Sequence, residues 1–117
     1  MGITDSDYMP RDGSTNLTAA ETGDGVKVGP CPLGGMLIEV YRPAAGTTFT
    51  VHFEESDDDV TYTDMAQPAA AGTTFTTAGI DHLKAFWEKQ YVRHVVSACT
   101  GNFGAVEIGF VQGGKPS

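Results

Sequence analysis

Apolar and polar residues alternate in three stretches of the chain, which is the pattern of β-strands with one buried face. The stretches lie at 36–41, 49–54 and 105–111. Their apolar faces consist of Met36, Ile38 and Val40 in the first, Phe49, Val51 and Phe53 in the second, and Val106, Ile108 and Phe110 in the third. We expect these faces to meet in one core.

Turn residues separate these strands from further predicted ones. Residues 54–59 read EESDDD, and Val60 and Tyr62 then resume the alternation. This pattern predicts a hairpin whose acidic turn lies in water. Residues 91–99 are rich in β-branched side chains, and a Gly-Asn-Phe-Gly turn at 101–104 leads from them into the last strand.

Residues 80–90 (IDHLKAFWEKQ) fit two structures. Ile80, Leu83 and Trp87 have helical spacing behind Asp81, and Asp is a favoured helix cap, so a short amphipathic helix is one prediction. A loop that leads into the following strand fits the same residues equally well. The sequence leaves both open.

The heptapeptide AAGTTFT occurs twice, at 44–50 and at 70–76. In both copies Pro and Gly enclose a turn of small residues, and the Thr-Thr-Phe-Thr segment that follows favours a strand with its Phe inward. The flanking sequences share almost nothing, whereas a solenoid repeats longer units at least three times. We interpret the copies as two turn-and-strand starts, not as two modules.

Together the patterns predict about seven to eight short strands between residues 26 and 112, joined by Gly, Pro and Asp turns. Such spacing is typical of an antiparallel β-sandwich or jelly roll. A chain of 117 residues has room for one such domain. We therefore predict an all-β fold with at most one short helix, near 80–90, and a tail at 113–117.

The first 25 residues are rich in Asp, Ser, Thr and Gly and show no lasting period, so we interpret residues 1–25 as an extended arm. Ordering such a segment costs about 1 to 2 kcal/mol per residue in backbone entropy. Its own domain or a neighbouring subunit must then hold it, and we favour the neighbouring subunit. Tyr8, Met9, Arg11 and Leu17 are the candidate anchors of this arm on its partner.

The charge of the chain argues against two kinds of partner. Fifteen acidic and seven basic residues give a net charge of −8, which repels nucleic-acid backbones and anionic lipid. No apolar run approaches the length of about 18 residues that a membrane helix needs, and no secretory signal pattern is present. We expect a soluble protein without a nucleic-acid or membrane partner.

The two cysteines, Cys31 and Cys99, lack C-x-x-C spacing. If the fold brings them together, they can form a disulfide, but two buried, reduced thiols are the favoured interpretation.

No arrangement of residues indicates catalysis. The sequence contains no His-x-His pair, no H-E-x-x-H motif and no Cys/His cluster, so we expect neither an enzyme nor a zinc or copper centre. The acidic run 54–59 offers the carboxylate oxygens that calcium prefers, with Asp57 and Asp59 as candidate ligands, but it lacks the glycine-punctuated loop of an EF-hand. We predict no cofactor and keep calcium at this turn as an alternative to a hydrated hairpin tip.

Two hairpins resemble those of small virion proteins of tailed bacteriophages. Residues 51–66 (VHFEESDDDVTYTDMA) are similar to their strand, E-E-S-D-D-G-x-T-(F/Y)-T-x-(L/M)-A, strand hairpin, with Asp59 in place of the usual turn glycine. Residues 91–93 (YVR), a Gly-Asn turn and residues 106–111 (VEIGFV) are similar to their closing K-x-Y-V-R … V-x-V-G-F-V hairpin. The pair Phe86 and Trp87 is bulkier than those proteins lead us to expect before Tyr91.

This resemblance implies a capsid decoration, or cement, protein, or a related minor head or tail component. It implies a sandwich or jelly roll on the outer shell of the virion, often a homotrimer, which stabilises the capsid by bridging neighbouring subunits. The major capsid protein and other copies of the chain are then its partners, and the protein is made in the host cytoplasm. The resemblance transfers no catalytic or metal residue.

A phage tail or head-surface module that binds a glycan or receptor is the alternative function. Phe86, Trp87 and Tyr91 would then form an aromatic contact patch for a sugar. Aromatic residues in such an arrangement are more often part of the core.

Overall fold

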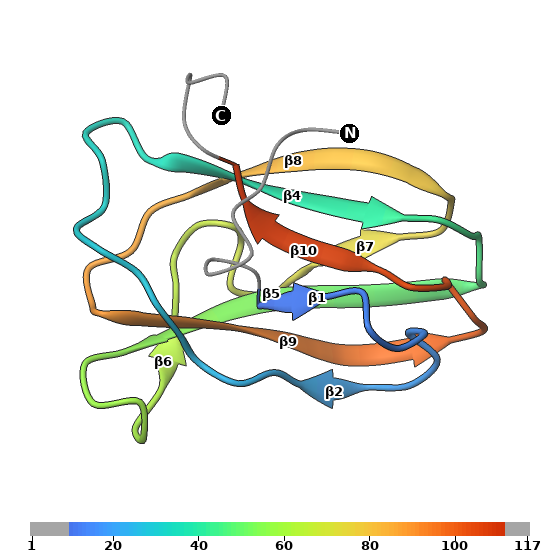
Figure 1. Ribbon diagram of the computed structural model, residues 1–117, viewed down its shortest axis with the longest axis horizontal. Coiled ribbons are helices and arrows are strands. Elements are labelled where there is room, and N and C mark those ends of the chain that lie inside the picture. Colours follow the sequence, from blue (N-terminus) through green and yellow to red (C-terminus); the bar gives the residue numbers. More distant parts are fainter. Residues whose placement is uncertain (1–9, 112–117) are drawn as a thin grey trace.

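The computed structural model describes residues 10–111, which form two antiparallel β-sheets packed face to face (Figure 1). One sheet has four strands in the order β1-β10-β4-β8. In the other, six-stranded sheet, β2 and β3 pair with β9, β9 pairs with β5, and β5 pairs with β6 and β7. The predicted all-β antiparallel sandwich is confirmed.

The strands are more numerous than the predicted seven to eight because several are very short. The four-stranded sheet contains β1 (Arg11–Asp12), β4 (Met36–Arg42), β8 (Gly79–Ala85) and β10 (Glu107–Phe110). The six-stranded sheet contains β2 (Glu21–Thr22), β3 (Val26–Lys27), β5 (Thr48–Ser56), β6 (Thr63–Asp64), β7 (Thr73–Phe75) and β9 (Tyr91–Thr100). Within residues 10–111 no helix is long and apolar enough to cross a membrane.

The alternating strands supply the core, as predicted. β4 and β5 follow one another in the chain but lie in different sheets, so their apolar faces meet between the two layers. The side chains at the predicted inward positions of β4, β5 and β10 are almost fully excluded from solvent, with Met36 only partly buried. Burying each such side chain contributes about 1.5 to 3 kcal/mol relative to leaving it exposed.

The two AAGTTFT copies pair with each other. Each copy starts a strand, β5 or β7, and the two strands are antiparallel with Phe49 directly opposite Phe75. The two rings lie 5.2 Å apart between their centroids, and the Thr50 and Thr74 hydroxyls hydrogen-bond at 2.8 Å. The interpretation as two turn-and-strand starts is confirmed, and the repeat supplies both halves of one cross-strand contact.

Residues 10–25 are part of the sandwich, which corrects their interpretation as an arm that a neighbouring subunit holds. β1 pairs with β10 and β2 pairs with β9, so this segment adds a strand to each sheet. Between them Leu17 is completely buried in the core. Its N–H donates to the Gly104 carbonyl at 2.8 Å, and its own carbonyl accepts from the Phe103 N–H at 3.0 Å.

Two local predictions were wrong. Residues 79–85 form strand β8, neither a helix nor a loop, because seven successive residue pairs join them to β4. The strand after the acidic turn begins at Thr63, so Val60 lies in the turn and is largely exposed. In both places long-range pairing decided the structure over the local pattern.

Candidate functional site

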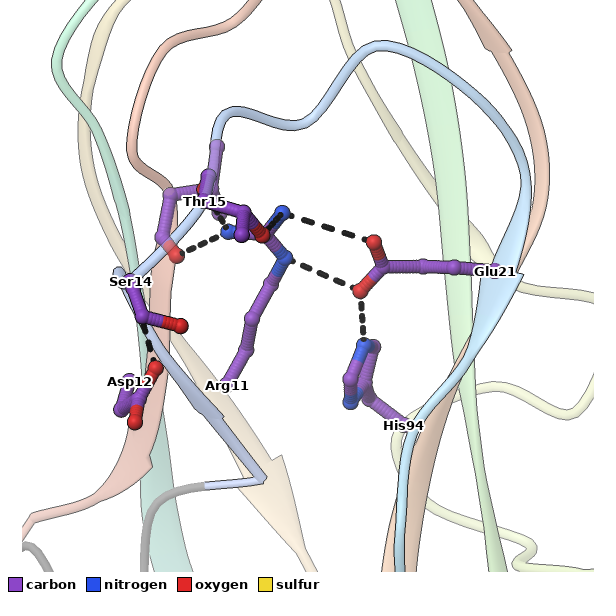
Figure 2. A network of polar contacts seen from close by, with 7 residues as sticks. Arg11, Asp12, Ser14, Thr15, Glu21 and His94 are labelled. Carbon is purple, nitrogen blue, oxygen red and sulfur yellow. Dashed lines mark hydrogen bonds and ion pairs between the residues drawn. The ribbon is translucent and has the colours of Figure 1, made fainter.

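An ion pair connects the two sheets where the N-terminal segment crosses between them. Arg11 on β1 donates from Nε to Glu21 Oε2 on β2 at 2.9 Å, and Figure 2 shows the two side chains pointing toward each other. Arg11 Nη1 also donates to the carbonyls of Thr15 at 2.9 Å and Val106 at 2.7 Å. The buried guanidinium therefore ties residues 10–22 to both layers of the sandwich.

His94 joins this network from β9. Its Nε2 lies 2.6 Å from Glu21 Oε2, and its ring is only 2% exposed (Figure 2). Its Nδ1 makes no hydrogen bond of standard geometry with a described residue. Burial lowers the pKa of His94 below its ordinary value, whereas the hydrogen bond and charge of Glu21, and more weakly the Pro10 carbonyl, oppose that shift.

The Glu21 carboxylate accepts hydrogen bonds from both Arg11 and His94. Burial raises the pKa of Glu21, but the hydrogen bonds from Arg11 and His94 outweigh burial and hold it below the usual range. A solvent-open cavity of about 400 Å³ adjoins the network, lined by parts of residues 10–15 and 21–26. Because Glu21 accepts from both partners, it joins Arg11 on β1 and His94 on β9 in one network.

The backbone of β8 presents an unpaired edge. The N–H of Val111, which follows β10, donates to the Leu37 carbonyl on β4. Every second residue of β4, counted from Leu37, therefore bonds toward β10, and the residues between them, such as Ile38 and Val40, turn their backbone groups toward β8. By the observed register, the β8 residues that bond to β4 are Gly79, Asp81, Leu83 and Ala85. The N–H and C=O groups of Ile80, His82 and Lys84 consequently point away from the sheet, and no strand within residues 10–111 pairs with them.

Phe86, the next residue in the series Ile80, His82 and Lys84, supports this orientation of the edge. Phe86 donates its N–H to the Gln67 carbonyl at 3.2 Å, on the side away from β4. A groove of about 510 Å³ lies beside the open part of the edge, lined by residues 66–69, Thr73 and residues 82–84. A row of free donors and acceptors next to a groove can accept an additional strand.

Apolar side chains flank this edge on the outer face of the four-stranded sheet. Leu37, Ile80 and Phe86 are each exposed. Leu37 lies opposite Lys84 in the β4–β8 register, and Ile80 lies opposite Tyr41. The edge therefore combines open hydrogen-bonding groups with apolar surface, which is the combination found at strand-pairing interfaces.

The aromatic residues considered for sugar binding do not form one exposed platform. Trp87 is 6% exposed, packs edge-on against Phe110 and donates its Nε1–H to the Gly29 carbonyl at 2.8 Å. Tyr91 is half-buried on β9, and only Phe86 is exposed. Trp87 is thus a core residue, which removes the central ring of the glycan-binding alternative.

The acidic turn is organised by its own hydrogen bonds. Asp58 Oδ1 accepts from the N–H groups of Val60 and Thr61 at 2.9 Å each and from the Ser56 hydroxyl, which lowers the pKa of Asp58 to about 2. Asp59 accepts from the Tyr62 hydroxyl and has a φ of 60°. Asp57 and Asp59 belong to no group of three potential metal ligands among the described residues, and calcium at this turn stays a prediction.

The remaining predicted residues fall in separate places. Arg11 and Leu17 are internal to the sandwich and cannot reach a neighbouring subunit while buried, whereas Tyr8 and Met9 lie outside the described residues. Cys31 and Cys99 are free thiols, and both are half-buried instead of buried. Burial raises the pKa of Cys99.

Comparisons with protein-family models, with curated proteins and with solved structures found no match.

The sequence patterns missed three features of these sites. Glu21 lies in a segment without periodicity, so nothing local marks it as the partner of Arg11. The open edge of β8 depends on which strand lies beside it, and no local signal reports that. His52 and Glu54 do share one face of a predicted strand, and that spacing was a usable signal, because the fold adds Asp64 to them as a third potential metal ligand.

Proposed function

We propose that this protein is a structural virion protein of the decoration, or cement, type. It binds the outside of a phage capsid and stabilises the shell by bridging neighbouring capsid subunits. Its partners are the major capsid protein and other copies of itself. It acts as a homotrimer, so that one trimer contacts several capsid subunits. It acts by binding, without catalysis or a membrane.

The observation on which the proposal depends most is the open edge of β8. Ile80, His82 and Lys84 offer three N–H and three C=O groups that no described strand satisfies, and Leu37 and Phe86 add exposed apolar surface beside them. A strand from a capsid subunit placed there would extend the four-stranded sheet. Main-chain pairing of this kind supplies affinity, and the flanking side chains supply specificity.

Two further features support the same function. The hairpin at 51–66, which resembles that of small phage virion proteins, has its left-handed residue at Asp59, where those proteins have the turn glycine. Only Gly, Asn and Asp adopt that conformation readily. The net charge of −8 also favours solubility before assembly on a capsid.

A proline on β8 tests the proposal. In Lys84→Pro the lost N–H is one that points away from β4, so no internal hydrogen bond is broken, but an added strand can no longer pair. Lys84→Ala is the matched control because it removes the same side chain and keeps the N–H. After light scattering gives the mass of each variant, each is incubated with undecorated capsids and sedimented.

We expect the unaltered chain and Lys84→Ala to co-sediment stoichiometrically and to protect the shell from heat, and Lys84→Pro to remain in the supernatant. If Lys84→Pro binds capsids as well as the control does, β8 is not the contact. If the unaltered chain itself does not bind capsids, the function is wrong.

A further inference from the structure

We propose that His52, Glu54 and Asp64 form a binding site for one divalent transition-metal ion of the zinc class. The site lies on the outer face of the six-stranded sheet, apart from the β8 edge and from the Arg11 network. It does not depend on the virion function proposed above.

The backbone places the three side chains together. His52 and Glu54 are two residues apart on β5, so both point to the same face. Asp64 on β6 is directly opposite Glu54 in the antiparallel register. A His-x-Glu pair on one strand and an Asp on its neighbour therefore converge without any loop having to move.

The distances suit a small tetrahedral ion. His52 Nε2 lies 3.6 Å from Glu54 Oε2 and 3.5 Å from Asp64 Oδ1, and the three ligand atoms are all within 4.8 Å of one another. Bonds of about 2.0 to 2.2 Å to a tetrahedral zinc place ligand atoms about 3.3 to 3.6 Å apart. The half-exposed Asp64 can rotate to close the third distance.

Arg93 leaves the metal-facing oxygen of Glu54 free. Arg93 donates from Nε to Glu54 Oε1 at 2.8 Å, and its Nη2 forms an ion pair with the same oxygen at 2.6 Å. It is the other oxygen, Oε2, that faces His52. The guanidinium is itself held over the Tyr62 ring at 3.9 Å. A carboxylate fixed in this way is the outer-shell arrangement usual around metal ligands.

The donor set and charge indicate the class of ion. One imidazole nitrogen and two carboxylate oxygens suit zinc and its neighbours in the first transition row, whereas calcium needs six to eight oxygens. Two carboxylates against one guanidinium leave one net negative charge beside the imidazole. Three protein ligands leave the fourth position of a tetrahedral ion to water.

Titration of the tag-free chain with Zn²⁺ tests the site, with Co²⁺ as a visible spectroscopic probe. The experiment uses a Cys31→Ser, Cys99→Ser background so that thiols cannot bind the ion. His52→Ala and Asp64→Asn each remove one ligand on the sheet surface. His82→Ala is the control, because His82 also contacts a carboxylate, Glu39 at 3.0 Å, but belongs to no group of three ligands among residues 10–111.

We expect one Zn²⁺ per chain, visible Co²⁺ bands that Zn²⁺ abolishes and millimolar Ca²⁺ does not, and at least a tenfold loss of affinity in His52→Ala and in Asp64→Asn. His82→Ala should bind as the parent does. The proposal is overturned if the parent binds no Zn²⁺, or if either ligand variant, shown to be folded by circular dichroism, binds with unchanged affinity and an unchanged Co²⁺ spectrum.

Discussion

Truncating Leu17 tests whether the N-terminal segment is part of the folded domain. Leu17 is completely buried, and its backbone is held by two hydrogen bonds to the turn at 103–104. In Leu17→Ala the backbone therefore stays in place and the core cannot close around the missing side chain. Leu→Ala changes at such sites cost about 2 to 5 kcal/mol, more where the cavity persists, so we expect about 3 to 5 kcal/mol here.

A loss of that size is large beside the total stability of about 5 to 15 kcal/mol that domains of this size have. At about 4 °C per kcal/mol, it lowers Tm by roughly 12 to 20 °C. The measurement is urea and thermal unfolding of the purified protein followed by circular dichroism. The midpoint should fall while the slope with urea stays the same, because the surface exposed on unfolding hardly changes.

Leu33→Ala is the matched control, since Leu33 is fully exposed and the same atoms are removed from water-facing surface. We expect it to leave stability within about 0.5 kcal/mol of the unaltered chain. If Leu17→Ala is as stable as Leu33→Ala, the segment does not pack on its own sandwich in solution. The interpretation of residues 1–25 as an arm held by another subunit would then regain support.

Three further predictions concern the polar network, the acidic turn and the core tryptophan. Because the pKa values of His94 and Glu21 are both lowered in the folded chain, the unfolded chain binds protons at a higher pH than the folded chain does. The urea midpoint should therefore fall as the pH drops below about 6.5 and again below about 4.5, and the first fall should be smaller in His94→Gln; an equal fall in that variant would contradict the assignment. Asp59→Gly and Asp59→Ala both lose the hydrogen bond from Tyr62, but glycine adopts a φ of 60° without strain. Urea unfolding should therefore show Asp59→Gly to be about 1 kcal/mol more stable than Asp59→Ala. Equal stabilities of the two variants would exclude strain at this turn. Trp87 should emit at short wavelength and resist acrylamide quenching, with no change on adding sugars, since its ring is buried; red-shifted, sugar-sensitive emission would revive the glycan-binding alternative.

The sequence by itself determined the fold class and the inner faces of the main strands. Period-two alternation in β4, β5 and β10 is a local property, and a strand with one apolar face has to bury it against another layer. For the same reason the start of β5 and the start of β7 could be predicted from the AAGTTFT repeat. Turn chemistry also acts locally, so the acidic hairpin was recognised, although its second strand begins later than predicted.

The pairing of distant residues was decided only by the tertiary structure. Leu17 and Arg11 lie in a segment without periodicity, and they are buried because two short strands dock on edges supplied by β9 and β10. β8 has spacing that fits a helix, yet seven pairs with β4 make it a strand. The Glu54–Asp64 register brings a third potential ligand to His52, and the absence of a described neighbour beyond β8 leaves its edge open. Each of these depends on which strand lies beside which, and backbone pairing between residues far apart in the chain leaves no mark on the local pattern of either partner.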